Sequence, residues 1–279
     1  MHRILRFPNF KCKALTISYD DGAIFDKRLV EIMNKHNIKG SFNIPTGFLS
    51  QSERYLNLSD LVDLYKGHEI ALHGHMHLSL GKISNIEIVK DVLENRRILE
   101  KEFNQIITGF AYANGSYTQN AKEILKSIDI RYARTVNRDH AFNLPTDFLE
   151  WNVTCAHRDA NLFELLDKFL DLKPNSPEKW KLNRNSKLFY LYGHSYEFED
   201  NNNWEIFEKF CAKASNNEDV WYATSSEICS YINAYNSLVY SLDNSLVYNP
   251  TATTIYAEFY RKNYVIKPNE TVKIEVLPY

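Results

Sequence analysis

The sequence lacks an excess of charge of either sign. Its 279 residues include 33 Lys and Arg against 35 Asp and Glu, which gives a formal net charge of −2 at pH 7. It also contains no long run of Lys or Arg. A chain with this balance offers no broad electrostatic attraction to a polyanion. We therefore expect no nucleic-acid partner and no binding to an anionic membrane surface.

Long apolar runs are also missing. No stretch of the sequence is long enough to cross a bilayer, so we expect no membrane span. The first residues, MHRILRFPNFKCKALTISYDDG, lack the uninterrupted apolar segment that marks a secretory signal. On this ground we expect a cytoplasmic protein.

Cysteine is scarce and widely spaced. The four cysteines are Cys12, Cys155, Cys211 and Cys229, and no two of them have CxxC spacing. This pattern argues against a zinc knuckle and against the disulfide framework of a small secreted scaffold. Reduced thiols are the simplest interpretation, with Cys155 expected to be a small buried apolar side chain.

The chain does contain enough apolar residues for a large core, since 44% are hydrophobic and 24% are charged. Runs of strand length alternate with helical patterns, beginning with ALTISY followed by FDKRLVEIMNKHNI. About seven such units predict an α/β fold in which a parallel sheet closes, or nearly closes, into a distorted (β/α)7–8 barrel. In such a barrel, active residues lie at the carboxyl ends of the strands.

The pattern changes after Tyr235. The remaining segment is rich in β-branched and aromatic residues, has turn signals and shows no helical period. We therefore predict a catalytic barrel over residues 1–235 and a small β-rich appendage over residues 236–279. The pentapeptide NSLVY begins at both Asn236 and Asn244, which a hairpin or two edge strands would explain.

Adjacent carboxylates end the first predicted strand, in the segment SYDDG. Asp20 and Asp21 would repel each other in a dry site. Asp favours turns and Gly22 permits a positive φ, so one interpretation is a turn with a solvated acidic pair. The other is a functional pair that has partners elsewhere in the chain.

Three histidines, His73, His75 and His77, follow another predicted strand in the segment HGHMH. Imidazoles four residues apart can converge on one ion, and a nearby carboxylate would complete the set of ligands. His73 and His77 are therefore the expected ligands. Alternatively, the histidines line the solvent side of a strand or are hydrogen-bonded groups of the core.

These segments resemble two motifs of the polysaccharide deacetylases, carbohydrate esterase family four. Ser18 to Gly22 resembles the family's T-F-D-D-G motif, and His73 to His77 resembles its H-x-x-x-H motif. In the same order, GFAYANGSY stands at the place of an Arg-x-Pro-Tyr segment and LYGHS at the place of a Leu-x-His segment. The similarity spans residues 12 to 232, approximately, and implies the family's distorted barrel.

The resemblance also implies a chemistry. Asp21, His73 and His77 correspond to the family's metal ligands, Asp20 to its catalytic base and His194 to its general acid. A divalent ion, with zinc expected first and cobalt, nickel or iron(II) also suitable, would polarise the acetamide and bind the attacking water. The implied activity is hydrolysis of a non-peptide C–N bond that releases acetyl groups from an N-acetylated sugar or polysaccharide.

By the same resemblance, the backbone N–H of Asn114 would hold the oxyanion, and Tyr112 and Trp151 would lie near the substrate. Two departures from the family stand out. Ala111 occupies the position of an arginine that supports the base, and the segment from Trp151 to Arg158 lacks the acidic residues that hold this arginine.

Arg134 and His157 lie at the ends of the next two predicted strands. Our hypothesis is that Arg134 supplies the missing positive charge and that His157 helps to hold the substrate or the base. An exposed, salt-bridged arginine is the alternative for Arg134. A role for Glu197 in orienting His194 is also open. We expect His75 either to support the site without binding metal or to be exposed.

Two other functions stay open. One is a metal hydrolase of the same fold that acts on another C–N amide or on an ester. The other is an inert carbohydrate-binding relative. The complete set of expected catalytic residues weighs against the inert relative: Asp20, Asp21, His73, His77 and His194.

Overall fold

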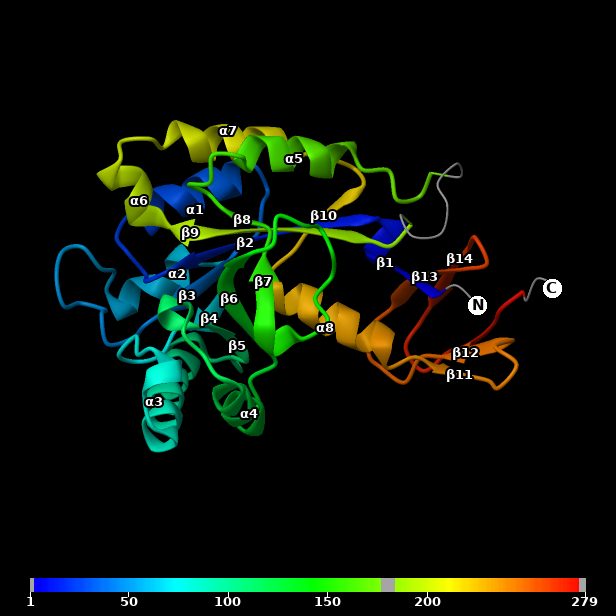
Figure 1. Cartoon of the computed structure of the whole chain (residues 1–279), viewed down its shortest axis with the longest axis horizontal. Helices are drawn as coiled ribbons and strands as arrows, with labels where there is room; N and C mark the ends of the chain where they lie inside the picture. The colour runs from blue at the N-terminus through cyan, green and yellow to red at the C-terminus, as the bar shows by residue number, and fades with distance from the viewer. Residues whose placement is uncertain (1–2, 177–183, 276–279) are drawn as a thin grey trace.

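A parallel β-sheet forms the centre of the molecule in this computed structural model, which describes residues 3–176 and 184–275 (Figure 1). The strand order is β7-β6-β5-β4-β3-β2-β9-β8, and β10 pairs with the free part of β2. Every pairing in this sheet is parallel. The strands are β2 (Lys13–Asp20), β3 (Ser41–Ile44), β4 (Glu69–Leu72), β5 (Gly109–Ala111), β6 (Tyr132–Arg138), β7 (Trp151–Val153), β8 (Cys155–Ala156), β9 (Lys187–His194) and β10 (Val220–Tyr222).

One short run of chain nearly closes this sheet. β7 pairs with β6 and β8 pairs with β9, so they lie at opposite ends of the strand order, yet only Thr154 separates them in sequence. The Thr154 N–H donates to the carbonyl of Tyr190 on β9 at 2.9 Å. The run from β7 to β8 therefore spans the gap, and the predicted barrel is confirmed.

Helices cover the outside of the barrel. In Figure 1, α1, α5 and α7 lie together along one side, and α3 and α4 lie along the opposite side. The prediction of helices between the strands is confirmed, and the short α6, directly after β9, was not expected. The helices are α1 (Asp26–Lys35), α2 (Leu61–Leu64), α3 (Asn85–Phe103), α4 (Gln119–Ser127), α5 (Leu162–Asp171), α6 (Ser195–Asp200), α7 (Glu205–Ala214) and α8 (Ser225–Asn236).

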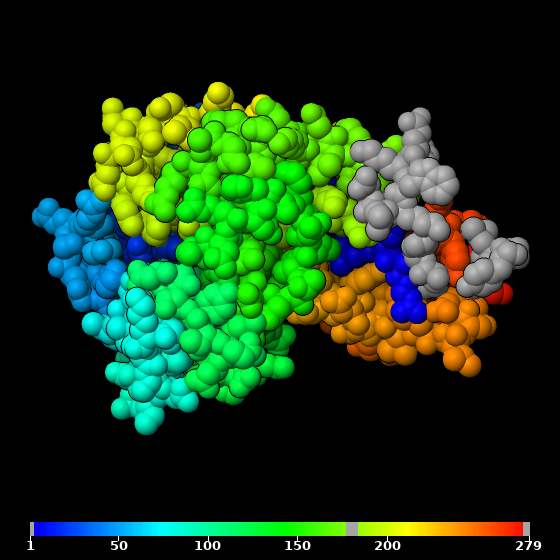
Figure 2. Space-filling view, viewed as in Figure 1, coloured from blue at the N-terminus to red at the C-terminus, as the bar shows by residue number. Residues whose placement is uncertain are grey.

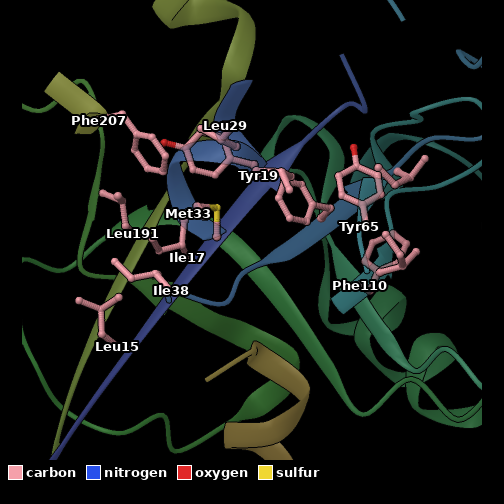
Figure 3. Close-up of a cluster of buried hydrophobic side chains, with 14 of the residues drawn as sticks. Leu15, Ile17, Tyr19, Leu29, Met33, Ile38, Tyr65, Phe110, Leu191 and Phe207 are labelled. Carbon is pink, nitrogen blue, oxygen red and sulfur yellow. The ribbon is translucent and has the colours of Figure 1, made fainter. Parts of the chain in front are cut away.

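The core lies between the strands and these helices. All eight residues of β2 are buried, as expected for a strand covered on both faces. Leu15, Ile17 and Tyr19 alternate along β2 and belong to the same cluster as Leu29 and Met33 of α1 (Figure 3). The helical spacing of the two α1 residues places them on one face, and this packing fixes the carboxyl end of β2.

Two small antiparallel sheets form the appendage, which lies at one end of the molecule (Figure 2). The first is β1-β13-β14 and the second is β11-β12-β15. Because β1 pairs with β13, the first sheet takes one strand from the amino-terminal part of the chain. The strands are β1 (Arg3–Arg6), β11 (Val239–Tyr240), β12 (Leu246–Tyr248), β13 (Ile255–Phe259), β14 (Lys262–Ile266) and β15 (Thr271–Lys273).

The two NSLVY segments pair with each other, since Val239 lies opposite Tyr248 in the β11–β12 ladder. The hairpin prediction is therefore confirmed. The division at residues 235 and 236 stays a prediction, although α8 ends and the β-rich segment begins at this point. A buried ion-pair cluster holds β13 to the rest of the molecule, with Glu258 2.6 Å from Arg6 and 2.5 Å from Arg184.

All four cysteines fall within the described residues, where each is buried and free of disulfide bonds. Burial raises the pKa of the Cys155 thiol, which suits the apolar role expected for it. In residues 3–176 and 184–275, no helix combines the length and the apolar character that crossing a bilayer requires.

Candidate active site

The two adjacent carboxylates lie in a tight turn at the end of β2. Asp21 has a φ of 81° and Gly22 a φ of 61°, and the Asp21 N–H donates to the carbonyl of Asn43 at 3.0 Å. A left-handed backbone at a non-glycine residue is unfavourable and often marks a functional site. The turn itself was predicted. However, the pair is not solvated, because Asp20 is only 3% exposed and Asp21 only 8%.

His73 comes directly after β4, and its ring has a defined orientation. Its Nδ1–H donates to the carbonyl of Ala111 at 2.8 Å, which leaves the Nε2 lone pair free. His73 Nε2 lies 3.7 Å from Asp21 Oδ1, and His77 Nε2 lies 3.6 Å from the same oxygen. His77 also has a positive φ, 55°, so its backbone turns sharply where its side chain reaches the site.

This cluster fits a divalent cation. The nearest ligand atoms of Asp21, His73 and His77 all lie within 4.8 Å of one another. Asp21 Oδ1 is buried and has no hydrogen-bond donor within the described part of the chain. A buried charged oxygen without a partner is costly, and a cation would satisfy it. One carboxylate and two imidazoles are a donor set that zinc and similar ions bind.

Two polar residues of α3, which the sequence reasoning missed, hold the histidine segment in place. Asn95 accepts from the His73 N–H at 2.9 Å and donates to the carbonyl of Ile44 at 2.9 Å. Asp91 accepts from the Met76 N–H at 2.7 Å. Both are buried, and their spacing of four places them on one helix face. Polar residues on the apolar face of the predicted helix were the available signal.

His75 points away from the cluster of ligands. Its Nδ1 lies 2.9 Å from the Thr46 hydroxyl, and Thr46 in turn accepts from the Asn95 side chain at 3.0 Å. The structure thus places His75 in a supporting network, as expected.

Asp20 is held by a buried arginine. One guanidinium nitrogen of Arg134 lies 2.6 Å from Asp20 Oδ1 and 2.5 Å from Oδ2. Asn43 donates to Oδ1 at 2.7 Å. Burial raises the pKa of Asp20, but the charge of Arg134 and the nearby histidines outweigh burial and hold that pKa below its usual value. Asp20 is thus ionised near neutral pH, and Arg134 is fully buried rather than an exposed, salt-bridged arginine.

His194 ends β9 and lies opposite Asp20 in the β2–β9 ladder. Its Nε2 is 3.9 Å from Asp20 Oδ2 and 3.9 Å from Asp21 Oδ2, and its Nδ1 is 3.6 Å from Glu197 Oε1. Burial lowers the pKa of His194, yet the three carboxylates together raise it above its usual value. The imidazole can therefore donate a proton across the site from Asp20.

His157 does not contact Asp20, which corrects the expectation that it supports the base. Its Nε2–H donates to Glu197 at 2.9 Å, and its Nδ1 accepts from the Tyr19 hydroxyl at 3.0 Å. Burial lowers the pKa of His157 despite the opposing effect of Glu197, which keeps the ring neutral. Both ring nitrogens are occupied, so His157 instead fixes the carboxylate that faces His194.

A pocket opens above these residues. Tyr112 and Asn114 line it, and their roles toward the substrate and the oxyanion stay predictions. Five further lining residues were not assigned to the site from the sequence: Val136, Arg138, Arg158, Tyr192 and Tyr196. The full lining is Asp20, Asp21, His73, His77, Tyr112, Asn114, Val136, Arg138, Arg158, Tyr192, His194 and Tyr196.

Trp151 is not among the lining residues, and its expected place beside the substrate is wrong. The side chain is 2% exposed and packs edge-on against Tyr132, Phe148 and Tyr190. Trp151 begins β7, and its ring points into the core rather than toward the pocket.

Comparison with known proteins places this geometry in a known fold. Residues 8–133 match the family described as polysaccharide deacetylase. A structure from Mycobacterium smegmatis, assigned to the polysaccharide deacetylases, aligns with a TM-score of 0.62 at 16% identity over 84% of this chain and 94% of the other. This likeness shows the fold. No curated protein sequence matches the chain.

Two further structures align less closely. A Streptococcus pyogenes deacetylase in complex with acetate aligns at 22% identity and a TM-score of 0.45, over 48% of this chain and 61% of that protein. A carbohydrate esterase family four pseudoenzyme from Bacillus anthracis aligns at 16% identity and a TM-score of 0.48, over 81% of this chain and 68% of the other.

Proposed function

We propose that the chain is a divergent member of the polysaccharide deacetylase family, whose model matches residues 8–133, and that it removes N-acetyl groups from an N-acetylated sugar or polysaccharide. The observation that carries the proposal is the pairing of Asp20 with Arg134 directly beside the candidate ligand cluster. In this arrangement Asp20 is an ionised base next to a cluster that could hold a Lewis acid, and His194 is a proton donor across the site.

Asp21, His73 and His77 would hold one divalent ion. When bound, that ion would polarise the acetamide carbonyl and make water a better nucleophile at neutral pH. Zinc suits the two imidazoles and one carboxylate well, and cobalt, nickel and iron(II) bind similar sets.

Asp20 acts as the base in this proposal. Its two oxygens accept from Arg134, and the low pKa keeps it ionised, so it can take a proton from the attacking water. Asp21 faces His73 and His77, with which it would hold the ion, whereas Asp20 pairs with Arg134. The two adjacent carboxylates can therefore have different roles.

His194 acts as the acid. Once water has added to the acetyl carbon, the C–N bond breaks and the amine nitrogen takes a proton from His194. The products are acetate and the free amino sugar. Glu197 faces His194 Nδ1 and stabilises the protonated ring, so the donor is charged before the bond breaks. We assign the backbone N–H of Asn114 to the oxyanion, since this residue lines the pocket.

The test measures acetate release from a panel of N-acetyl sugars, with and without chelator, together with the metal content of the purified protein. We expect stoichiometric metal and activity that is lost with chelator and restored by zinc. Asp20→Asn should abolish turnover and keep the metal, whereas Asp21→Asn should lose both. Metal bound without acetate released from any sugar would instead favour a same-fold hydrolase of another amide or ester, or an inert relative.

A further inference from the structure

Two arginines lie on the rim of the pocket and have no role in the proposed chemistry. Arg138 is the last residue of β6, and Arg158 follows β8. Among the lining residues, the acidic side chains are Asp20 and Asp21, both at the pocket floor. Arg134 already compensates Asp20, and a divalent ion would more than compensate Asp21. The rim of the pocket thus carries two guanidiniums, each paired with a carboxylate that does not itself line the pocket.

Neighbouring carboxylates hold the two arginines in place without using all of their donors. Arg138 contacts Asp159, which also accepts from the Ala156 N–H at 2.9 Å. Arg158 contacts Glu197, which also lies next to His157 and His194. The Arg138 side chain is 36% exposed and the Arg158 side chain 53%. A guanidinium carries five N–H donors, so each arginine keeps donors that can face the pocket.

A phenol adds a further donor to the lining of this pocket. Tyr192 lines the same pocket and is nearly buried. Burial raises the pKa of Tyr192, although the charges of Arg134, Arg138 and Arg158 oppose this effect. The Arg134 guanidinium carbon lies 4.9 Å from the centre of the Tyr192 ring. The hydroxyl remains protonated and can donate to an anion.

We propose that the substrate is an N-acetylated sugar with an anionic group, a carboxylate or a phosphate, near the reacting acetamide, and that Arg138 and Arg158 bind this group. The inference rests on the proposed deacetylase activity. Guanidinium forks match the planar geometry of a carboxylate and the oxygens of a phosphate, which makes arginine selective for both. Because Arg138 ends β6 and Arg158 follows β8, the two guanidiniums can donate to the anion from different directions.

The experiment compares the steady-state kinetics of N-acetylglucosamine, its 6-phosphate and N-acetylmuramic acid, which carries a carboxylate. We expect KM to be lower by about tenfold for at least one anionic sugar than for the neutral one, as for a partly exposed charged hydrogen bond. The anionic sugar with the lower KM, the phosphate or the carboxylate, identifies the preferred anion.

Arg138→Gln is the decisive variant, because its partner Asp159 lies outside the catalytic groups. It should raise the KM of the preferred anionic sugar by about tenfold and leave kcat and the neutral KM within about twofold. Arg158→Gln should raise the KM of the anionic sugar in the same way. Because Arg158 also pairs with Glu197, which faces His194, the kcat for the neutral sugar shows whether this substitution has disturbed His194. Arg97→Gln is the matched control, since it removes an equally paired but remote arginine from α3.

Equal KM values for neutral and anionic sugars, or equal effects of Arg138→Gln on both, would overturn the inference. Calorimetric titration of the same sugars into metal-loaded wild type and Arg138→Gln separates this result from failure of the proposed function. If no sugar releases acetate, the deacetylase proposal fails. In that case, a preference for anionic sugars in the titration that depends on Arg138 would still support the anion-binding site. The absence of such a preference would refute the site.

Discussion

Arg134 contacts Asp20 from the strand next to the one on which the family carries its arginine. In the β5–β6 ladder, Arg134 lies opposite Ala111, the position where the resemblance implies an arginine. Residues at the same register of neighbouring parallel strands present their side chains to the same face of the sheet. The guanidinium therefore comes from the strand next to the position that the resemblance implies, and it lies 2.5 Å from the Asp20 carboxylate.

Arg134→Met should raise the pKa of Asp20, because burial would then be opposed by the nearby histidines without the charge of Arg134. Activity needs the ionised carboxylate and is lost as pH falls through this pKa. The acid limb of kcat/KM should therefore move to higher pH by at least about one unit. Arg134→Lys keeps the charge and should move the limb less.

The measurement is a pH–rate profile of the zinc-loaded variants. Breaking a buried ion pair also destabilises a protein by about 3–5 kcal/mol, so urea denaturation should accompany the kinetics. An acid limb that stays in place in a folded Arg134→Met protein would show that Arg134 does not tune the base.

Glu197→Gln should weaken the acid. Burial lowers the pKa of His194, and Glu197 is one of the groups that raise it. Without that carboxylate the pKa of His194 falls. The imidazole then loses its proton at a lower pH than in the wild type, so the basic limb of the pH–rate profile moves to lower pH. We expect kcat to fall about tenfold, within the usual range for general acid catalysis, with little change in KM.

Glu208→Gln is a suitable control, because Glu208 forms an exposed ion pair with Arg28. A basic limb unchanged in Glu197→Gln would mean that His194 does not depend on this carboxylate.

Asn95→Ala should weaken metal binding without removing a ligand. The substitution leaves the His73 N–H and the Ile44 carbonyl without their partner, so the histidine segment loses its attachment to α3. Residues that orient metal ligands typically contribute about 10–100-fold in affinity. Zinc affinity measured against a competing chelator should fall in that range. Asn85→Ala removes an exposed asparagine of the same helix, and an equal loss in that control would contradict the expectation.

Asp26 should make stability depend on pH. Burial raises its pKa to about 7, although Tyr65 donates to it at 2.6 Å. The unfolded carboxyl ionises near pH 4, so between about pH 4 and 7 rising pH favours the unfolded chain. The free energy of unfolding should fall by up to about 4 kcal/mol over this interval.

Asp26→Asn should remove that slope and be more stable than wild type at pH 8, with a smaller difference at pH 5. Urea denaturation of the metal-free proteins at both pH values measures this effect. Asp63→Asn, on the exposed face of α2, should behave like wild type. Parallel pH dependence in wild type and Asp26→Asn would show that Asp26 ionises normally.

Local sequence patterns predicted much of the fold. Apolar runs such as ALTISY predicted buried strands because only a strand covered on both faces is apolar throughout. The carboxyl ends of parallel strands share one edge, and the family resemblance implied Asp21, His73 and His77 as the ligands that meet there. The structure places their ligand atoms together. The repeated NSLVY segment was expected to form a hairpin or two edge strands, and its two copies pair with each other.

Other predictions depended on which way a side chain turns at the end of a strand. His157 and Trp151 both lie near strand ends. His157 is hydrogen-bonded to Tyr19 and Glu197, whereas Trp151 packs against aromatic rings of the core. Asp91 and Asn95 lie on a helix remote in sequence from the motifs that they support.

The sequence by itself determined the order of strands and helices and the residue types needed for the proposed chemistry, because these depend on local periodicity and on spacing within short motifs. Only the tertiary structure decided which charges meet. Asp20 and Arg134 are 114 residues apart, and their contact depends on the register of β5 with β6 and on the near-closure of the barrel. Those features come from packing across the whole chain, which no short segment encodes.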